Sequence, residues 1–401
     1  MFMAVGTALI GVLLFLRRRS LIGETLSHAA FPGLLVGIFF STLLPKSSSE
    51  MSFIGMTLGA GVFAFFGMKC VSWMEKYCKA NADTALTFIL ASFMGFGILL
   101  ASILQKSHPV DYRQALLYLY GQAATISIVQ SLLYQYFALF LIFFMIAFYP
   151  YLKIICFDTP HAQTLGINYK PIENGIFFLL VITIILGIRS VGVMLMAGML
   201  IGPAASARPW AKSLSSMLAI AAVFGAASAL LGNILSFKLS RTSFSLPTGP
   251  MILLSASSLC IISLLIAPQR GLIVRIVRMQ LFRFRSKMEN GLKLIWKKPG
   301  SSPQISPLIR FSLRLRGWLT SEGRLTPQGK IRAQRIVRLH RLWEVYLVEY
   351  LGQNVEKVHR TAEELEHLFS PTLEQELSQL LNYPLKDPHE QPIPPIHGDH
   401  P

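Results

Sequence analysis

The amino-acid sequence predicts a mostly α-helical protein, in which a polytopic membrane bundle of about eight or nine spans is followed by a small soluble region. Of its 401 residues, 53% are hydrophobic and only 14% are charged, which is too apolar for an ordinary soluble protein. Apolar runs of about 20 residues, enough to cross ~30 Å of hydrocarbon, fill residues 2–268, and charge is concentrated beyond them. We therefore expect a membrane domain over residues 1–268 and a soluble tail.

The number of spans depends on Arg189, which could interrupt one irregular element or separate two short helices. Small residues recur within the segments, as in "GVMLMAGMLIGPAASA" (residues 192–207). They permit close helix packing in lipid, which favours a transporter or channel over a simple anchor. The expected spans are residues 2–16, 24–44, 53–74, 83–105, 126–150, 174–188, 190–207, 213–235 and 247–267.

Basic residues predict the orientation, because Lys and Arg mark the cytoplasmic side of a membrane. They cluster at residues 17–19, 69–79, 153–170, 208–212 and 270–298, which predicts an external start and a cytoplasmic tail. The net charge of +17 would also suit nucleic acid, so charge alone does not choose between membrane and DNA. The four scattered cysteines, none of them in the tail, indicate neither a disulfide framework nor a thiolate metal site.

Two ionisable residues, Glu24 and His28, lie one helical turn apart just inside an apolar segment. Ionisable groups at membrane depth are costly and usually face a partner or a transport path. An ordinary alternative is a helix-capping Glu beside a neutral His, and the residues alone leave both open. Asp83 is a lesser pathway candidate, because an acid at a helix start is more often a cap.

The stretch "LRRRSLIGETLSHAAFPG" (residues 16–33) resembles the signature of the permease subunits of zinc, manganese and iron ABC importers. Three more stretches resemble that family in the expected order: "FDTPHAQTLGI" (157–167), "RSVGVMLMAGMLIGPAASAR" (189–208) and "LPTGPMILL" (246–254). The resemblance covers about residues 1–270. It implies that Glu24 and His28 line the metal pathway.

The resemblance also implies the cell context and the partners. It places the chain in a bacterial inner membrane with a second permease subunit, identical or homologous, a separate ABC ATPase and an extracytoplasmic metal-binding lipoprotein. The sequence has no G-x-x-x-x-G-K-[ST] phosphate loop, so we expect no enzyme activity in this chain. The second stretch matches the loop that docks the ATPase through a short coupling helix, which points to Phe157, Asp158, Ala162 and Gly166.

Residues 269–305 are a basic linker in which basic and apolar residues alternate at helical spacing. Such a segment can lie on an anionic membrane surface or start a DNA-binding domain. Residues 306–334 read as a short basic helix, two small strands around Glu322 and Gly323, and a helix capped by Thr326 with Pro327 at its first position. A helix followed by a hairpin is the second half of a winged helix, which makes Arg310, Arg314 and Arg316 candidate DNA contacts.

The last region, residues 335–401, contains "VEKVHRTAEELEHLFSP" (residues 355–371). On a helix, His359, Glu363, Glu366 and His367 share one side. That pattern fits a divalent ion, although an acidic, solvated helix face has the same pattern.

Residues 305–395 resemble the metal-binding and dimerisation domain of the diphtheria-toxin-repressor and manganese-regulator family. The match implies a primary metal site at Glu363, Glu366 and His367, and a second or shared site at His340, Glu344 and His359. An all-oxygen and nitrogen ligand set favours Mn(II) or Fe(II). Two departures stand out: "MENGLKLIW" (from Met288) offers only Asn290 and Lys293 where that family has acidic or sulfur ligands, and the winged-helix segment is about a dozen residues short.

These features predict a divalent-metal permease fused to a metal-responsive repressor. The repressor consists of a winged-helix-like part and a helical metal-binding part. We expect proteolysis between about residues 270 and 305 to release it, so that it can bind operator DNA. An alternative is a tail that senses metal in the cytoplasm and gates transport in place. A second alternative is a transcription factor on a degenerate membrane anchor.

Overall fold

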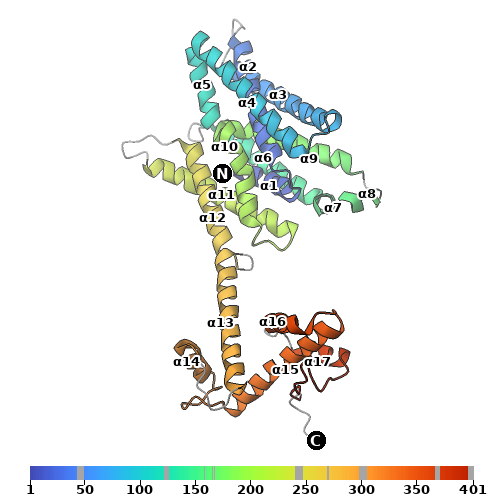
Figure 1. The fold of residues 1–401 in the computed structure, drawn as a ribbon. Helices are drawn as coiled ribbons and strands as arrows, with labels where there is room; N and C mark the ends of the chain where they lie inside the picture. Colours follow the sequence, from blue (N-terminus) through green and yellow to red (C-terminus); the bar gives the residue numbers. More distant parts are fainter. Residues whose placement is uncertain are drawn as a thin grey trace. The chain divides into compact units, whose positions relative to one another are not determined.

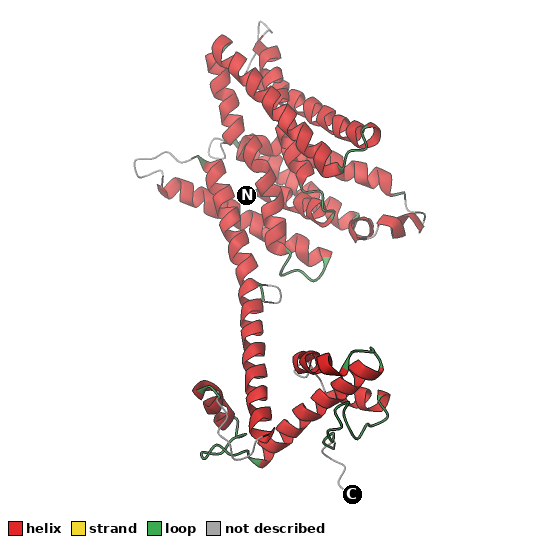
Figure 2. Ribbon diagram, in the orientation of Figure 1, coloured by secondary structure: helices red, strands yellow, loops and turns green. Residues whose placement is uncertain are grey.

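A computed structural model of the protein describes residues 1–42, 49–121, 126–157, 159–164, 166, 168–239, 247–268, 271–297, 305–365 and 371–395. The chain divides into two compact units, residues 1–275 and 276–401. Helices account for nearly all the regular structure in both units (Figure 2), and the β-structure of the described residues consists of two isolated bridges.

The first unit is a bundle of helices (Figure 1). Its helices are α1 (Phe2–Leu16), α2 (Leu21–Thr42), α3 (Ser49–Tyr77), α4 (Ala82–Ser107), α5 (Pro109–Tyr120), α6 (Ile128–Ala147), α7 (Tyr149–Phe157), α8 (Thr159–Thr164), α9 (Tyr169–Val191), α10 (Val193–Ala207), α11 (Leu214–Leu239) and α12 (Thr248–Ile266).

Within the described residues, seven helices are long and apolar enough to cross a membrane: α2, α3, α4, α6, α9, α11 and α12. Helix α1 and the Leu195–Ala207 part of α10 are shorter apolar helices. Together these nine elements correspond to the nine expected segments, which confirms the helical membrane bundle. Helix α5 was not expected, because the polar residues Asp111, Arg113 and Gln114 interrupt its apolar run.

The break near Arg189 falls three residues later than expected. Helix α9 includes Arg189 in its last turn and ends at Val191, and α10 begins at Val193. Gly192 separates them with φ +100°, a conformation that L side chains rarely adopt, and a Cβ there would lie 2.6 Å from the Leu119 carbonyl oxygen. The glycine therefore divides one apolar stretch into two helices.

The helices of the first unit differ greatly in how much the unit covers them. In the apolar window of α2, 78% of the residues are buried, whereas in α4 the figure is 17%. Helix α2 packs on α3 and α4, while α1 packs on α6, α9, α10 and α11. The helix that carries Glu24 and His28 thus lies inside the bundle, whereas the rest of the chain leaves most of α4 uncovered.

Two G-x-x-x-G pairs bring α2 and α3 into backbone contact. Gly33 and Gly37 of α2 face Gly59 and Gly55 of α3, and a Cβ on either α2 glycine would lie 2.2 Å from the facing carbonyl oxygen. Close helix approach of this kind depends on small residues, since lipid tails provide no hydrophobic drive for association. The small-residue pattern of the sequence is therefore used for packing.

The second unit begins within α13 (Leu272–Lys297) and continues with α14 (Pro307–Leu315), α15 (Pro327–Glu349), α16 (Val355–Leu365) and α17 (Pro371–Leu380). The C-terminal turns of α13 belong to its core: Met288 and Leu292 are fully buried with Leu313 of α14 and Ala333 and Ile336 of α15. The segment expected to be a linker is thus continuous helix over 272–297. Most of the expected joint, residues 298–304, lies outside the described residues.

The expected hairpin and helix start are present in the second unit. Leu319 and Leu325 form an isolated antiparallel bridge on either side of the turn at Glu322 and Gly323. Thr326 then caps α15: its Oγ1 accepts a hydrogen bond from the Gly329 amide at 3.1 Å and donates to the Gly317 carbonyl at 2.6 Å. A side-chain oxygen at this position satisfies an otherwise unpaired helix amide, so α15 has a fixed start.

Candidate metal centre

Three side chains converge where α15 and α16 pack together. His340 and Glu344 lie one turn apart on α15, and His359 reaches them from α16. His340 Nε2 lies 2.9 Å from His359 Nδ1, His359 Nδ1 lies 2.8 Å from a Glu344 oxygen, and that oxygen lies 3.2 Å from His340 Nε2. Three potential ligand atoms thus form a small triangle.

Apolar packing holds this triangle in place. Leu347 of α15 is buried against Val358 and Ala362 of α16, next to His359 in the sequence. His340 and Glu344 are themselves almost fully buried, at 3% and 2% exposure, whereas the His359 side chain is 54% exposed. The site therefore has a rigid buried side and a single ligand that reaches solvent.

The electrostatics keep the carboxyl of Glu344 ionised. Burial by itself raises the pKa of Glu344, but the hydrogen bonds and positive charge of His340 and His359 outweigh it and lower the pKa from an ordinary 4.5 to about 2. At neutral pH the triangle therefore contains one carboxylate and two imidazoles. These are ligands for borderline and hard divalent ions.

The triangle has dimensions that suit a divalent ion. Ligands at right angles around an ion with bonds of ~2.1 Å lie about 3.0 Å apart, and tetrahedral zinc ligands lie about 3.3 Å apart. Hydrogen bonds alone satisfy the triangle poorly. Each of its three contacts needs a proton between the two atoms, but the two neutral imidazoles have one N–H each. An ion would instead accept all three lone pairs, so the donor set fits a metal.

The structure brings together half of the predicted ligand set. His340, Glu344 and His359 form the one cluster of metal-type ligands found among the described residues, and Glu363 lies exposed on α16 one turn beyond His359. Glu366 and His367 lie outside the described residues. The primary site implied by the resemblance therefore stays a prediction.

A lysine that sequence reasoning dismissed lies against this cluster. Lys293 of α13 places its Nζ 3.2 Å from His340 Nδ1, on the opposite edge of the imidazole from the triangle. The contact joins residues 47 positions apart, so no local pattern marks it. In the sequence, Lys293 stands out only because it matches a ligand position of the repressor-type family.

The predicted DNA contacts lie on or just after α14. Arg310 is half-buried, while Arg314 and Arg316 are exposed. Arg314 donates to the Ser321 carbonyl in the hairpin at 2.6 Å, and Arg316 stacks over Trp318 at 5.3 Å. The exposed large hydrophobic side chains of α14 are Leu308, Phe311 and Leu315, at 72%, 62% and 72%. The exposed surface of this helix thus carries apolar as well as basic side chains.

The predicted pathway residues of the first unit lie on two helices, α2 and α4. Glu24 and His28 are half-buried on α2, and the His28 Nδ1 atom is buried with no hydrogen-bond partner among the described residues. Asp83 is exposed in the first turn of α4. A buried imidazole nitrogen without a partner is costly unless a ligand uses it, whereas Asp83 has the position of a helix-end acid.

The region expected to couple to an ATPase forms two short helices. Phe157 is exposed at the end of α7, Ala162 is fully buried in α8, and Gly166 follows with φ +71°. Asp158 lies outside the described residues. A short helix is therefore present where the resemblance implies one.

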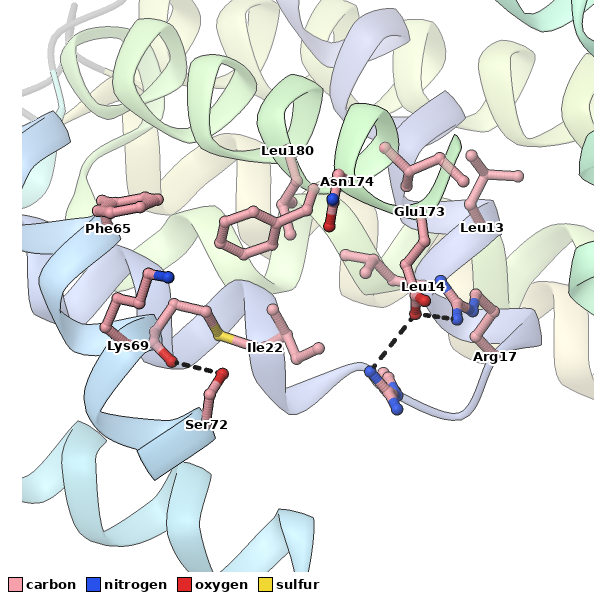
Figure 3. A pocket seen from close by; sticks show the side chains of 14 residues that line it. Leu13, Leu14, Arg17, Ile22, Phe65, Lys69, Ser72, Glu173, Asn174 and Leu180 are labelled. Atoms are coloured by element: carbon pink, nitrogen blue, oxygen red, sulfur yellow. Dashed lines mark hydrogen bonds and ion pairs between the residues drawn. The ribbon is translucent and has the colours of Figure 1, made fainter. Parts of the chain in front are cut away.

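A cavity of about 270 Å³ lies at the end of the bundle where α1, α2, α3 and α9 meet (Figure 3). Arg17, at the end of α1, forms an ion pair with Glu173 of α9, and Arg19 lies 3.8 Å from the same carboxylate. Lys69 of α3 also lines the cavity and lies over the Phe65 ring. These charged residues thus link α1 and α9 near the basic segments at residues 17–19 and 69–79. Such segments mark the predicted cytoplasmic side of the membrane.

These features define a polytopic membrane protein with a metal-type ligand cluster in a separate helical unit. Comparison with known proteins agrees with that class. Residues 1–267 match the family model "ABC 3 transport family", and residues 326–395 match "Iron dependent repressor, metal binding and dimerisation domain". The chain belongs to the ABC 3 transport family and is its membrane-spanning permease, not the ATPase. Permeases of this family act with an ATPase and a solute-binding protein.

Some similar proteins match both the permease and the C-terminal region of this chain, and others match the permease alone. A probable metal transport system membrane protein of Chlamydia pneumoniae is 33% identical, with 97% of this chain and 93% of that protein covered. The zinc transport system membrane protein TroC of Treponema pallidum is 31% identical over 69% of this chain and 90% of its own. The solved structure of PsaBC from Streptococcus pneumoniae in complex with Fab has a TM-score of 0.58 at 25% identity, covering 70% of this chain and 91% of that one.

Proposed function

We propose that this chain is the permease subunit of an ATP-driven importer of a divalent metal, Mn(II), Fe(II) or Zn(II), in a bacterial inner membrane. Its C-terminal unit is a cytoplasmic metal sensor for the same transport system. The observation that carries the sensing role is the triangle of His340, Glu344 and His359. The choice of metals is supported by TroC, which is named for zinc transport, and by the manganese transport system membrane protein MntC of Bacillus subtilis, which is 31% identical to this chain over 73% of its length.

In the importer, Glu24 and His28 provide oxygen and nitrogen ligands for the passing ion. Their support is position: both lie half-buried on α2, the most covered of the candidate spans. A second permease subunit completes the pore, an extracytoplasmic lipoprotein delivers the ion, and the ATPase docks at Phe157, Asp158, Ala162 and Gly166.

In the sensor, His340, Glu344 and His359 hold the ion, with Glu363, Glu366 and His367 as the neighbouring ligands. Because these ligands come from both α15 and α16, a bound ion would stabilise the packing of the two helices. The unit dimerises through this domain, as its family description states. We favour gating of transport in place as the output, because α13 forms a continuous helix from residue 272 into the core of the sensor.

Uptake of radioactive manganese tests both halves in cells that express the chain with its ATPase and lipoprotein. We expect His28→Ala to abolish uptake and Asp83→Asn to leave it nearly unchanged. In metal-starved cells we expect His359→Ala to take up manganese normally. When the cytoplasm is loaded with metal, uptake by the wild-type chain should be inhibited, whereas uptake by His359→Ala should not, even with transcription blocked. Normal uptake by His28→Ala would exclude the pathway, and normal inhibition in His359→Ala would exclude the sensor.

A second candidate output is repression of transport genes at operator DNA. It is favoured by the order of α14, hairpin and capped α15, which share one apolar core with α13. Arg310, Arg314 and Arg316 would contact the DNA, and cleavage between about residues 270 and 305 would release the tail. The test is metal-dependent binding of the purified full-length chain to its own promoter at fixed salt. Metal-dependent binding that Arg310→Ala abolishes would establish this output. Absence of binding with Mn(II), Fe(II) and Zn(II), both before and after cleavage of the chain between about residues 270 and 305, would exclude it.

A further inference from the structure

Lys293 contacts a metal ligand from the side that faces away from the metal. Its Nζ lies 3.2 Å from His340 Nδ1, while His340 Nε2 faces His359 and Glu344. Both side chains are buried, with Lys293 at 6% and His340 at 3% exposure. Their positions are fixed from both helices: one turn before Lys293, Glu289 of α13 forms an ion pair with Arg332 of α15.

The contact determines which imidazole nitrogen carries the proton. An ammonium group donates hydrogen bonds and accepts none, so His340 Nδ1 must accept from Lys293. The proton of the neutral ring then lies on Nε2, within the triangle. A metal-binding histidine needs the reverse arrangement: a lone pair at the metal and a ring N–H that donates to a carboxylate, carbonyl or water on the other side.

The positive charge of Lys293 also opposes metal binding. Lys293 and an ion in the triangle would lie on opposite edges of one buried ring, where like charges are poorly screened. In the repressor-type resemblance this helix contributes acidic or sulfur ligands, which attract a metal. Lys293 has the opposite sign.

We propose that Lys293 is an internal competitor of the metal ion. It holds His340 in the tautomer that cannot bind metal through Nε2, and an entering ion must displace the ammonium from His340. Metal affinity is lowered, so the sensor responds only above a raised metal concentration. Because Lys293 belongs to α13, which starts six residues after the last membrane span ends, displacement also changes a contact of that helix. This inference rests on the proposed metal site.

Titration of the metal-free, full-length chain in detergent with Co(II) tests the affinity. Ligand-field absorption reports the bound ion, and its loss in His359→Ala assigns the signal to the triangle. We expect Lys293→Met to bind about 10–100-fold more tightly, the range typical of outer-shell ligand changes. Lys293→Glu should bind at least as tightly, because its carboxylate can accept the His340 Nδ1–H.

The matched control is Lys287→Met, which removes the same charge from an exposed position on α13 and should leave the affinity unchanged. Unchanged or weaker binding by Lys293→Met, in a protein whose melting temperature is retained, would overturn the inference while leaving the metal site intact. A Co(II) signal that His359→Ala does not alter in any background would instead refute the proposed site, and the inference with it.

Displacement has a separate readout in lysine labelling followed by mass spectrometry. In the wild-type chain, saturating Mn(II) should raise the modification of Lys293 relative to that of Lys287, and His359→Ala should abolish the increase. Equal Lys293 labelling with and without bound metal would show that the ammonium stays in place, which contradicts displacement.

Discussion

Gly33 of α2 and Gly59 of α3 meet backbone to backbone: a Cβ added to either would lie 2.2 Å from the carbonyl oxygen of the other. Any side chain at these positions must push the two helices apart. We expect Gly59→Val to destabilise the membrane unit by about 1–3 kcal/mol or more, the usual range for overpacking. Thermal unfolding in detergent measures the effect, and Gly95→Val, whose Cβ meets no atom within 4 Å, is the control. Equal melting temperatures would contradict the close contact.

The ion pair of Arg17 and Glu173 links the ends of α1 and α9. Both side chains are partly buried, at 15% and 28% exposure, so we expect Glu173→Arg to destabilise the bundle by roughly 1 kcal/mol, near the upper end for exposed pairs. The double variant Arg17→Glu with Glu173→Arg should recover most of that loss in the same melting experiment. No recovery would show that the pair itself contributes little.

Stability of the metal-free second unit should fall in acid because of Glu344. Its pKa is about 2 in the folded chain, below its ordinary value of 4.5. The folded state therefore binds this proton less readily, and the stabilisation is fully present above about pH 4.5 and is lost as the pH falls towards 2. Glu344→Gln should be less stable at pH 5 and show a flatter dependence between pH 5 and 3. Parallel melting curves for both chains would contradict this.

The cap of α15 should contribute measurably to folding. Thr326→Ala removes the acceptor of the Gly329 amide hydrogen bond and should cost about 1 kcal/mol. Thr326→Ser keeps the oxygen and serves as the control. Denaturant unfolding, followed by tryptophan fluorescence, measures the difference, because the second unit contains Trp296, Trp318 and Trp343. Equal midpoints for Ala and Ser would refute the role of the cap.

Long apolar runs made the membrane bundle predictable, because a span must keep about 20 apolar residues together. The start of α15 was predictable for a similar reason, since the Thr326 cap and Pro327 act within one turn. Helix α5 was missed because its polar residues dilute the signal, and the break was misplaced because Arg189 is more conspicuous than Gly192.

The candidate metal centre could be predicted only in part. The i, i+4 spacing of His340 and Glu344 is visible in the sequence, but the arrival of His359 depends on how α16 packs on α15, and it was inferred from resemblance. The Lys293 contact with His340 joins different helices. No periodic pattern records such a contact, so Asn290 and Lys293 read only as poor ligands.

The unequal exposure of the three ligands has a kinetic consequence. His340 and Glu344 are almost enclosed, while more than half of the His359 side chain faces solvent. Exposed side chains change rotamer within picoseconds to nanoseconds, so this one arm can swing away and return without unfolding of the helices. We expect a bound ion to exchange quickly with the surrounding solution. A centre of this kind follows the momentary supply of metal instead of storing it.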